Sequence, residues 1–80
     1  MKDGNGKGKE FDDYGRLIFD GEYRNGKING RGKEFYYGGN LRFEGEYLNG
    51  KRNRGKEYDY NGKVIYEGEY KNGEKNNLLN

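Results

Sequence analysis

The chain of 80 residues contains no cysteine, histidine, proline, tryptophan, serine, threonine, glutamine or alanine. Without histidine, and with tyrosine as its sole hydroxyl, the chain lacks the side chains that most often act as general base or nucleophile. We therefore expect no enzymatic activity and no cofactor. A disulfide and a zinc site built from cysteine or histidine are excluded as well, and the lack of cysteine is compatible with a reducing compartment.

The chain also lacks a large excess of charge and a long apolar run. Its 16 basic and 14 acidic residues give a net charge of +2, which is too even to indicate nucleic acid as a partner. Short runs such as Leu17-Ile18-Phe19 are far below the roughly 20 residues of a membrane span, and residues 1–20 lack the apolar segment of a signal peptide. We expect a cytoplasmic chain, with peripheral attachment to a membrane as an alternative.

Three copies of one unit account for most of the sequence. Gly8-Lys9-Glu10-Phe11 matches Gly32-Lys33-Glu34-Phe35 and Gly55-Lys56-Glu57-Tyr58. Phe19-Asp20-Gly21-Glu22-Tyr23 matches Phe43-Glu44-Gly45-Glu46-Tyr47 and Tyr66-Glu67-Gly68-Glu69-Tyr70. The units, of 23–24 residues each, occupy 5–28, 29–52 and 53–75, and they leave 1–4 and 76–80 as terminal tails.

Each unit has the pattern of two strands. Aromatic residues alternate with polar ones, which is typical of a half-buried strand. Glycine recurs in every segment and no apolar stripe has helical spacing, so we expect no helix. We predict an all-β protein, an elongated single antiparallel meander of about six strands built from three hairpin repeats. The predicted strands are 6–12, 16–24, 31–37, 40–48, 55–60 and 63–71.

The expected register follows from the aromatic residues, since residues opposite each other share a face. It pairs Phe11 with Phe19, Phe35 with Phe43, and Tyr58 with Tyr66. This requires three-residue loops at 14–16, 38–40 and 61–63, each a type I turn followed by a left-handed residue. It also sets Lys9, Lys33 and Lys56 opposite Gly21, Gly45 and Gly68, where the glycines either leave room for a ring or lysine stem or relieve strand curvature.

The remaining connections, 25–30 and 49–54, are expected to be longer loops. The third unit lacks one residue in this region. A loop absorbs such a deletion, whereas a deletion inside a regular strand would turn every later side chain to the wrong face.

These units resemble the MORN repeat, the membrane occupation and recognition nexus motif, with the pattern aromatic-x-Gly-x-aromatic-x-x-Gly-Lys-x-x-Gly-x-Gly. In the first copy every fixed position is filled, by Phe19, Gly21, Tyr23, Gly26, Lys27, Gly30 and Gly32. The second copy lacks one glycine and has Phe43, Gly45, Tyr47, Gly50, Lys51 and Gly55. The third copy has Tyr66, Gly68, Tyr70 and Gly73, with Glu74 in place of the lysine.

The resemblance implies a twisted meander with one hairpin per repeat, and a role as a scaffold, dimerisation or membrane-proximal module. The chain is also similar to a class of bacterial repeat proteins with Gly-Asn-Lys-rich hairpins and antitoxin-like roles.

The predicted sheet separates aromatic residues from carboxylates. The aromatic face would hold Phe11, Phe19, Tyr23, Phe35, Tyr37, Phe43, Tyr47, Tyr58, Tyr60, Tyr66 and Tyr70. Its rings either form the core or present a groove to a partner helix or strand, in which case Tyr23, Tyr37, Tyr47, Tyr60 and Tyr70 are the candidate partner-binding residues. The acidic face would hold Glu10, Asp20, Glu22, Glu34, Glu44, Glu46, Glu57, Glu67 and Glu69. Its regular array favours solvation over catalysis, and we expect no metal site.

Basic residues gather beside the expected longer loops. They are Arg24, Lys27, Arg31, Lys51, Arg52, Arg54, Lys71 and Lys75. They either bind anionic lipid or solvate the loops and neutralise nearby carboxylates. The leading hypothesis is a non-enzymatic scaffold that binds a protein partner along its repeat surface. A peripheral membrane module and a bacterial or phage antitoxin-like protein are the alternatives, and self-association through open edge strands would cover the ends of the sheet.

Overall fold

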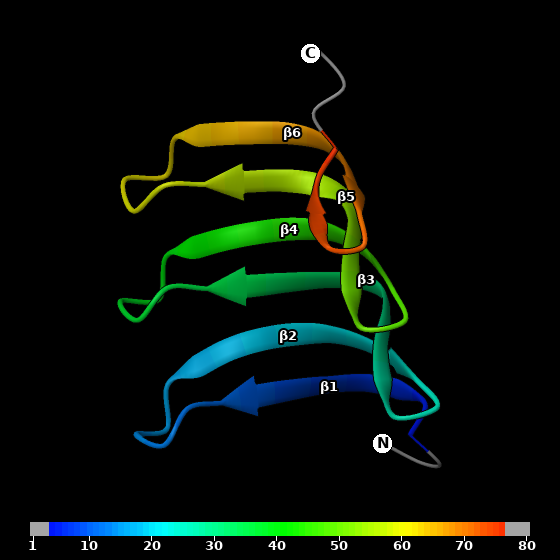
Figure 1. The fold of residues 1–80 in the computed structure, drawn as a ribbon. Coiled ribbons are helices and arrows are strands. Elements are labelled where there is room, and N and C mark those ends of the chain that lie inside the picture. Colours follow the sequence, from blue (N-terminus) through cyan, green and yellow to red (C-terminus); the bar gives the residue numbers. More distant parts are fainter. Residues whose placement is uncertain (1–3, 77–80) are drawn as a thin grey trace.

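The computed structural model describes residues 4–76, which form one antiparallel sheet with its strands in chain order (Figure 1). The strands are β1 (Gly6–Phe11), β2 (Leu17–Arg24), β3 (Lys27–Phe35), β4 (Leu41–Leu48), β5 (Lys51–Tyr58), β6 (Val64–Lys71) and β7 (Glu74–Lys75). The predicted all-β meander is confirmed, with the two-residue β7 as an additional strand. The sheet is elongated, with principal extents of 42 × 27 × 16 Å.

Two-residue Asn-Gly turns join β2 to β3, β4 to β5 and β6 to β7. The φ angles are 53° and 80° at Asn25-Gly26, 51° and 88° at Asn49-Gly50, and 55° and 84° at Asn72-Gly73. Asparagine and glycine tolerate this left-handed backbone, and such turns match the twist of the paired strands. The expectation of longer loops at 25–30 and 49–54 is therefore wrong, because the glycine-rich stretches after the turns belong to β3 and β5.

Three-residue loops connect the strands at the other end of the sheet. In the first loop, the amide of Asp12 donates to the carbonyl of Arg16 (2.9 Å) and the amide of Gly15 donates to the carbonyl of Asp12 (3.0 Å). These bonds enclose residues 13–15, and equivalent bonds enclose 37–39 and 60–62. The predicted loop length is correct, and Gly15 is left-handed with φ 83°, but each loop begins one residue earlier than expected.

The predicted register is wrong, because a β-bulge follows each of these loops. Phe11 pairs with Leu17, and the next pair is Glu10 with Phe19, so that Ile18 is an extra residue on β2. The same bulge puts Glu34 opposite Phe43 and Glu57 opposite Tyr66. A one-residue shift moves every later pair to the other face. In place of lysine–glycine pairs, the sheet has a continuous cross-strand row of Gly8, Gly21, Gly32, Gly45, Gly55 and Gly68.

A second set of bulges bends the sheet near the Asn-Gly turns. The register shifts between Gly21 and Tyr23 on β2 and between Glu46 and Tyr47 on β4. Figure 1 shows β3 and β5 bending sharply near their first residues, so that the hairpin ends turn away from the rest of the sheet. The one-residue deletion lies at this bend, where a bulge absorbs it inside the strand.

The core consists of rings from β2, β4 and β6 stacked over the glycine row. Phe19, Phe43, Tyr47 and Tyr70 are buried, and Tyr23, Ile28 and Tyr66 pack against them. Successive rings meet edge to face with centroids 5.3–5.9 Å apart, a favourable aromatic geometry. The prediction that rings of successive hairpins share one face is confirmed for these strands. Phe11, Phe35 and Tyr58, which were expected in the same row, are not part of the cluster.

Glycine is required beneath these rings because any side chain would occupy their place. A Cβ atom at Gly32 would lie 2.7 Å from Cζ of Phe19 and 2.9 Å from Cε1 of Tyr47. One at Gly55 would lie 2.7 Å from Cζ of Phe43. Each phenylalanine therefore covers the glycine of the following strand, which lets a single-layered sheet bury part of one face.

Candidate interaction surfaces

Three tyrosine–glutamate pairs repeat along the aromatic face, each with a sequence separation of 13 residues. The hydroxyl of Tyr23 donates to Glu10, that of Tyr47 to Glu34 at 2.6 Å, and Tyr70 lies 3.4 Å from Glu57. These carboxylates therefore lie among the rings. Their prediction for the acidic face is wrong, because it relied on the register without a bulge.

Arg52 contacts the carboxylates of the second and third pairs, Glu34 and Glu57. Its Nε and Nη2 atoms donate to the two carboxylate oxygens of Glu34 at 3.0 and 2.7 Å, and Nη1 lies 3.6 Å from Glu57. The guanidinium group stacks 4.4 Å from the centroid of Phe43. Burial raises the pKa of Glu34, but the hydrogen bonds from Arg52 and Tyr47 outweigh this effect and hold the pKa below its usual value.

Glu10 has a tyrosine partner but no equivalent cation. Three residues are equivalent because each is the second residue after an Asn-Gly turn: Ile28 on β3, Arg52 on β5 and Lys75 on β7. The first unit therefore has an apolar side chain where the other two have a cation. Lys75 lies 3.4 Å from Glu57, so the other two carboxylates have cationic partners. In the described part of the chain, no ion pair involves Glu10. The first unit thus presents a carboxylate beside an apolar side chain.

An open groove of about 560 Å³ runs across the aromatic face at this point. Its lining includes Glu10, Phe19 and Ile28 together with Glu34 and Arg42, and Tyr36, Tyr37 and Tyr60 form its rim at the loop end of the sheet. Tyr36 and Tyr60 stack on the rim with centroids 4.4 Å apart. The size is within the range of binding pockets, and its mixed apolar and charged lining suits a side chain with both characters.

Hydrogen bonds between the loop ends of successive hairpins hold the rim in place. The Tyr36 hydroxyl donates to the carbonyl of Tyr58 at 2.7 Å, and Nδ2 of Asn40 donates to the carbonyl of Tyr60 at 2.9 Å. The guanidinium group of Arg16 lies 4.3 Å from the ring centroid of Tyr37. These contacts hold the exposed rings in place before any partner binds.

The five tyrosines predicted to bind a partner have different surroundings. Tyr47 and Tyr70 are buried in the core, and Tyr23 is half-buried. Tyr37 and Tyr60 are 65% and 56% exposed, and both line the groove. Sequence analysis missed Tyr36, which replaces the aspartate found at the equivalent loop positions 12 and 59. This departure from the repeat could have identified Tyr36 as a candidate from the sequence.

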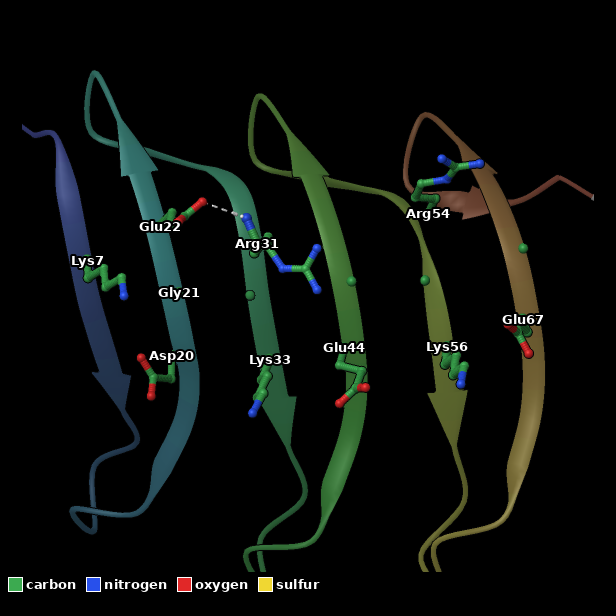
Figure 2. Close-up of a pocket in the computed structure, with 14 residues that line it drawn as sticks. Lys7, Asp20, Gly21, Glu22, Arg31, Lys33, Glu44, Arg54, Lys56 and Glu67 are labelled. Atoms are coloured by element: carbon green, nitrogen blue, oxygen red, sulfur yellow. Dashed lines mark hydrogen bonds between the residues drawn. The ribbon is translucent and has the colours of Figure 1, made fainter.

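The opposite face carries two rows of alternating charge beside a groove of about 810 Å³. One row runs Lys9, Asp20, Lys33, Glu44, Lys56 and Glu67 across the strands. The other contains Lys7, Glu22, Arg31, Glu46, Arg54 and Glu69. Figure 2 shows the members of these rows that line the groove and the hydrogen bond from the Arg31 amide to Glu22, at 2.9 Å. Alternation leaves no large area of one sign, and opposite charges directly across a strand pair stabilise the sheet.

The predicted anion-binding residues fall into three groups. Arg24, Lys27, Lys51 and Lys71 are exposed beside the Asn-Gly turns. Arg31 and Arg54 belong to the alternating row, where Arg54 lies 3.6 Å from Glu69. Arg52 and Lys75 contact carboxylates and rings of the aromatic face. The sheet therefore brings the first group together at one end of its strands and separates the others from it.

Neither a metal cluster nor a membrane-spanning helix occurs in residues 4–76. No group of three or more acidic side chains in this part of the chain could hold a metal ion, and no helix there is long and apolar enough to cross a membrane.

Comparison with known proteins identifies the repeat. A family model described as "MORN repeat" matches residues 19–41, 43–64 and 66–77. No curated protein and no solved structure matches the chain.

Proposed function

The chain belongs to the MORN repeat family, and we propose that it is a non-enzymatic scaffold that binds a protein partner in the aromatic-face groove. MORN repeats commonly mediate interaction with proteins or membranes. The observation that carries the proposal is that two departures from the repeat, Ile28 and Tyr36, line this one groove. The fold tolerates a cation and an aspartate at the equivalent positions, so the repeat does not require these two side chains.

The composition of the rim supports binding to protein. Tyrosine and arginine are among the residues that most often dominate the affinity of protein interfaces. Tyrosine offers a large contact area at low cost in conformational entropy. Tyr37 and Tyr60 expose their rings, and stacking with Arg16 and Tyr36 restricts them. A partner would therefore meet a rigid aromatic edge.

The lining of the groove indicates the chemistry of the partner. An apolar side chain would cover Ile28 and Phe19, and an adjacent lysine or arginine would reach Glu10 as Arg52 reaches Glu34. We therefore propose an extended segment with an apolar residue next to a basic one. Such a segment would supply the cation that the first unit lacks.

Selection from a phage-displayed library of linear random peptides tests this function. We expect enriched peptides to contain an aliphatic or aromatic residue beside lysine or arginine. Their affinity, measured by fluorescence anisotropy, should fall about tenfold with Tyr37→Ala or Tyr60→Ala, as for the truncation of an interface anchor. Ile28→Arg should weaken binding similarly, because the new guanidinium group would occupy Glu10.

Tyr14→Ala is the matched control, since Tyr14 is 83% exposed on an equivalent loop but does not line the groove. Its peptide affinity should equal that of the wild type. Failure to enrich any peptide, or equal affinity in the Tyr37→Ala and Tyr60→Ala variants, would refute the proposed site.

A second candidate function is peripheral binding to anionic membranes. The specific observation is the group of exposed basic residues beside the Asn-Gly turns, where Arg24 lies directly opposite Lys27. A basic residue near an anionic surface contributes about 1 kcal/mol. Co-sedimentation with phosphatidylserine vesicles should then be lost at high salt and in the Arg24→Gln/Lys27→Gln variant. Equal sedimentation with neutral phosphatidylcholine vesicles would rule this function out.

A further inference from the structure

Within residues 4–76, the outer edge of β6 is paired along only part of its length. In residues 4–76, β1 pairs with β2, and β6 pairs with β5 along its inner edge. On the outer edge of β6, β7 pairs with Tyr70 and Lys71, and the amide of Asn76 donates to the carbonyl of Glu69. The outer edge of 64–68 has no partner strand within that range. Unpaired backbone groups of this kind readily accept another strand.

The interior of the sheet shows which strand this edge is shaped to accept. On β2, Phe19, Asp20 and Gly21 pair with a Gly-Lys-Glu segment of β3. On β4, the same aromatic-acid-glycine sequence pairs with Gly-Lys-Glu of β5. Tyr66-Glu67-Gly68 on β6 has this sequence too, and Gly8-Lys9-Glu10 on β1 is the same Gly-Lys-Glu segment.

We propose that two copies of this chain associate head to tail, with β1 of one copy adding to the outer edge of β6 of the other. The interior pairs define the register as Tyr66 opposite Glu10, Glu67 opposite Lys9, and Gly68 opposite Gly8 of the second copy. The junction would repeat the pairing of β2 with β3 and of β4 with β5.

The terminal charges are complementary. Lys7 and Lys9 begin the alternating rows on β1, and Glu67 and Glu69 end them on β6. Head-to-tail addition therefore continues the alternation, whereas two copies of β1 or two copies of β6 would bring like charges together. Like charges directly opposite each other destabilise a strand pair, so the charges select this arrangement over the symmetric ones.

The aromatic face provides a second, independent fit. Phe19 and Phe43 each cover a glycine of the following strand, Gly32 and Gly55. In residues 4–76, no glycine of a following strand lies beneath the Tyr66 ring, which lies over its own Gly68 and near Lys75 of β7. Gly8 of a second copy would occupy the missing position beneath the edge of the ring, where glycine alone leaves sufficient space.

Within residues 4–76, β7 pairs with the end of β6 alone. Its pairs with Tyr70 and Lys71 correspond to those that Ile28 and Lys27 make with Tyr23 and Arg24 in the interior. β7 therefore pairs with β6 as the first residues of β3 pair with β2. β1 of the second copy would pair with β6 as the later residues of β3 pair with β2. Because the contact joins different surfaces, it generates open chains of molecules unless the rotation closes a ring.

Sedimentation velocity over a range of protein concentrations tests the proposal. The wild type should form oligomers that increase with concentration. Lys9→Glu and Glu67→Lys each place like charges across the junction, and each should weaken association about tenfold. An equimolar mixture of the two variants should associate again, because the Lys9→Glu strand is complementary to the Glu67→Lys edge.

Lys33→Glu is the matched control, because it makes the same charge reversal at an interior strand of the same row. It should associate as the wild type does, and circular dichroism should confirm strand content in every variant. A wild type that stays monomeric at all concentrations would overturn the proposal. So would association that is sensitive to Lys9→Glu but not to Glu67→Lys, since that result would indicate pairing of two β1 strands.

Discussion

Replacement of Arg52 by methionine removes the cation that joins the second and third units but keeps most of the side-chain volume. Arg52 contacts Glu34 at 2.7 and 3.0 Å and the Phe43 ring at 4.4 Å. The side chains of Arg52 and Glu34 are 17% and 25% exposed. The substitution leaves the Glu34 carboxylate largely shielded from water, with Tyr47 as its remaining hydrogen-bond donor among these groups.

The burial of the pair determines the expected magnitude. Removing one partner of a fully buried ion pair costs about 3–5 kcal/mol, and an exposed pair contributes about 0–1 kcal/mol. For this partly exposed pair we expect Arg52→Met to lower the free energy of unfolding by about 2 kcal/mol. Glu34→Gln in the same background should recover part of the loss, because the uncompensated charge is gone.

The pH dependence gives a second readout. The pKa of Glu34 is lowered in the folded chain. Its contribution to stability is therefore present above the ordinary glutamate pKa of 4.5 and is lost as the pH falls through the folded value. In Arg52→Met, burial acts on Glu34 without the opposing guanidinium group. The acid-induced loss of stability contributed by Glu34 should therefore be smaller in this variant than in the wild type, because the folded pKa of Glu34 moves up towards the unfolded value.

Urea unfolding followed by circular dichroism measures these effects in the two single variants and the double variant. Lys51→Met is the control, since Lys51 is exposed beside Arg52 and should change stability by less than about 0.5 kcal/mol. A loss below this value for Arg52→Met, or strict additivity in the double variant, would refute the assigned role of the ion pair.

Three further predictions use the same unfolding assay. Gly21→Ala should destabilise the sheet by more than about 1 kcal/mol, because the new Cβ atom would lie 2.7 Å from Cα of Gly32. Gly38→Ala should leave the free energy of unfolding almost unchanged, because a Cβ atom at Gly38 would meet nothing within 4 Å. Equal destabilisation by the two substitutions would contradict the need for glycine in the row. Asn49→Ala should lower the free energy of unfolding by about 1 kcal/mol, because Asn49 has a left-handed φ of 51° that alanine adopts at a cost. An unchanged free energy of unfolding would count against the left-handed turn. Burial raises the pKa of Tyr70 from 10.0 to about 12. The stability that the protonated hydroxyl contributes is therefore present below pH 10 and is lost as the pH rises towards 12. Tyr70→Phe should reduce this alkaline loss of stability, and an unchanged pH profile would argue against a buried hydroxyl.

The spacing of aromatic residues was sufficient to predict the sheet and the core rings of β2, β4 and β6. Phe19, Phe43 and Tyr66 recur in the same phase of each unit, and alternation along a strand places residues two apart on one face. Tyr23, Tyr47 and Tyr70 therefore follow them to the aromatic face, as the structure shows. The repeat thus determined which face is buried without knowledge of the strand pairing.

The pairing itself could not be predicted because bulges leave little trace in composition. Ile18, Arg42 and Ile65 are the extra residues after the three loops, and nothing in their side chains distinguishes them from regular strand residues. The predicted register required an uninterrupted ladder, and one extra residue moved Glu10, Glu34 and Glu57 to the opposite face.

The candidate site was predicted in part. Tyr37 and Tyr60 were chosen for their phase in the repeat, and both line the groove. The buried Tyr47 and Tyr70 were chosen by the same criterion, since exposure depends on neighbouring strands that a single segment does not reveal. The more informative residues, Ile28 and Tyr36, are those that break the repeat.

The central claim, that the rings of β2 and β4 cover a cross-strand row of glycines, can be tested by nuclear Overhauser spectroscopy of the labelled chain. We predict cross-peaks from the ring protons of Phe19 to the α-protons of Gly32, and from those of Phe43 to the α-protons of Gly55, with both glycine signals shifted upfield by the rings. Ring cross-peaks to the side chains of Lys33 and Lys56 in their place, with unshifted glycine signals, would contradict it.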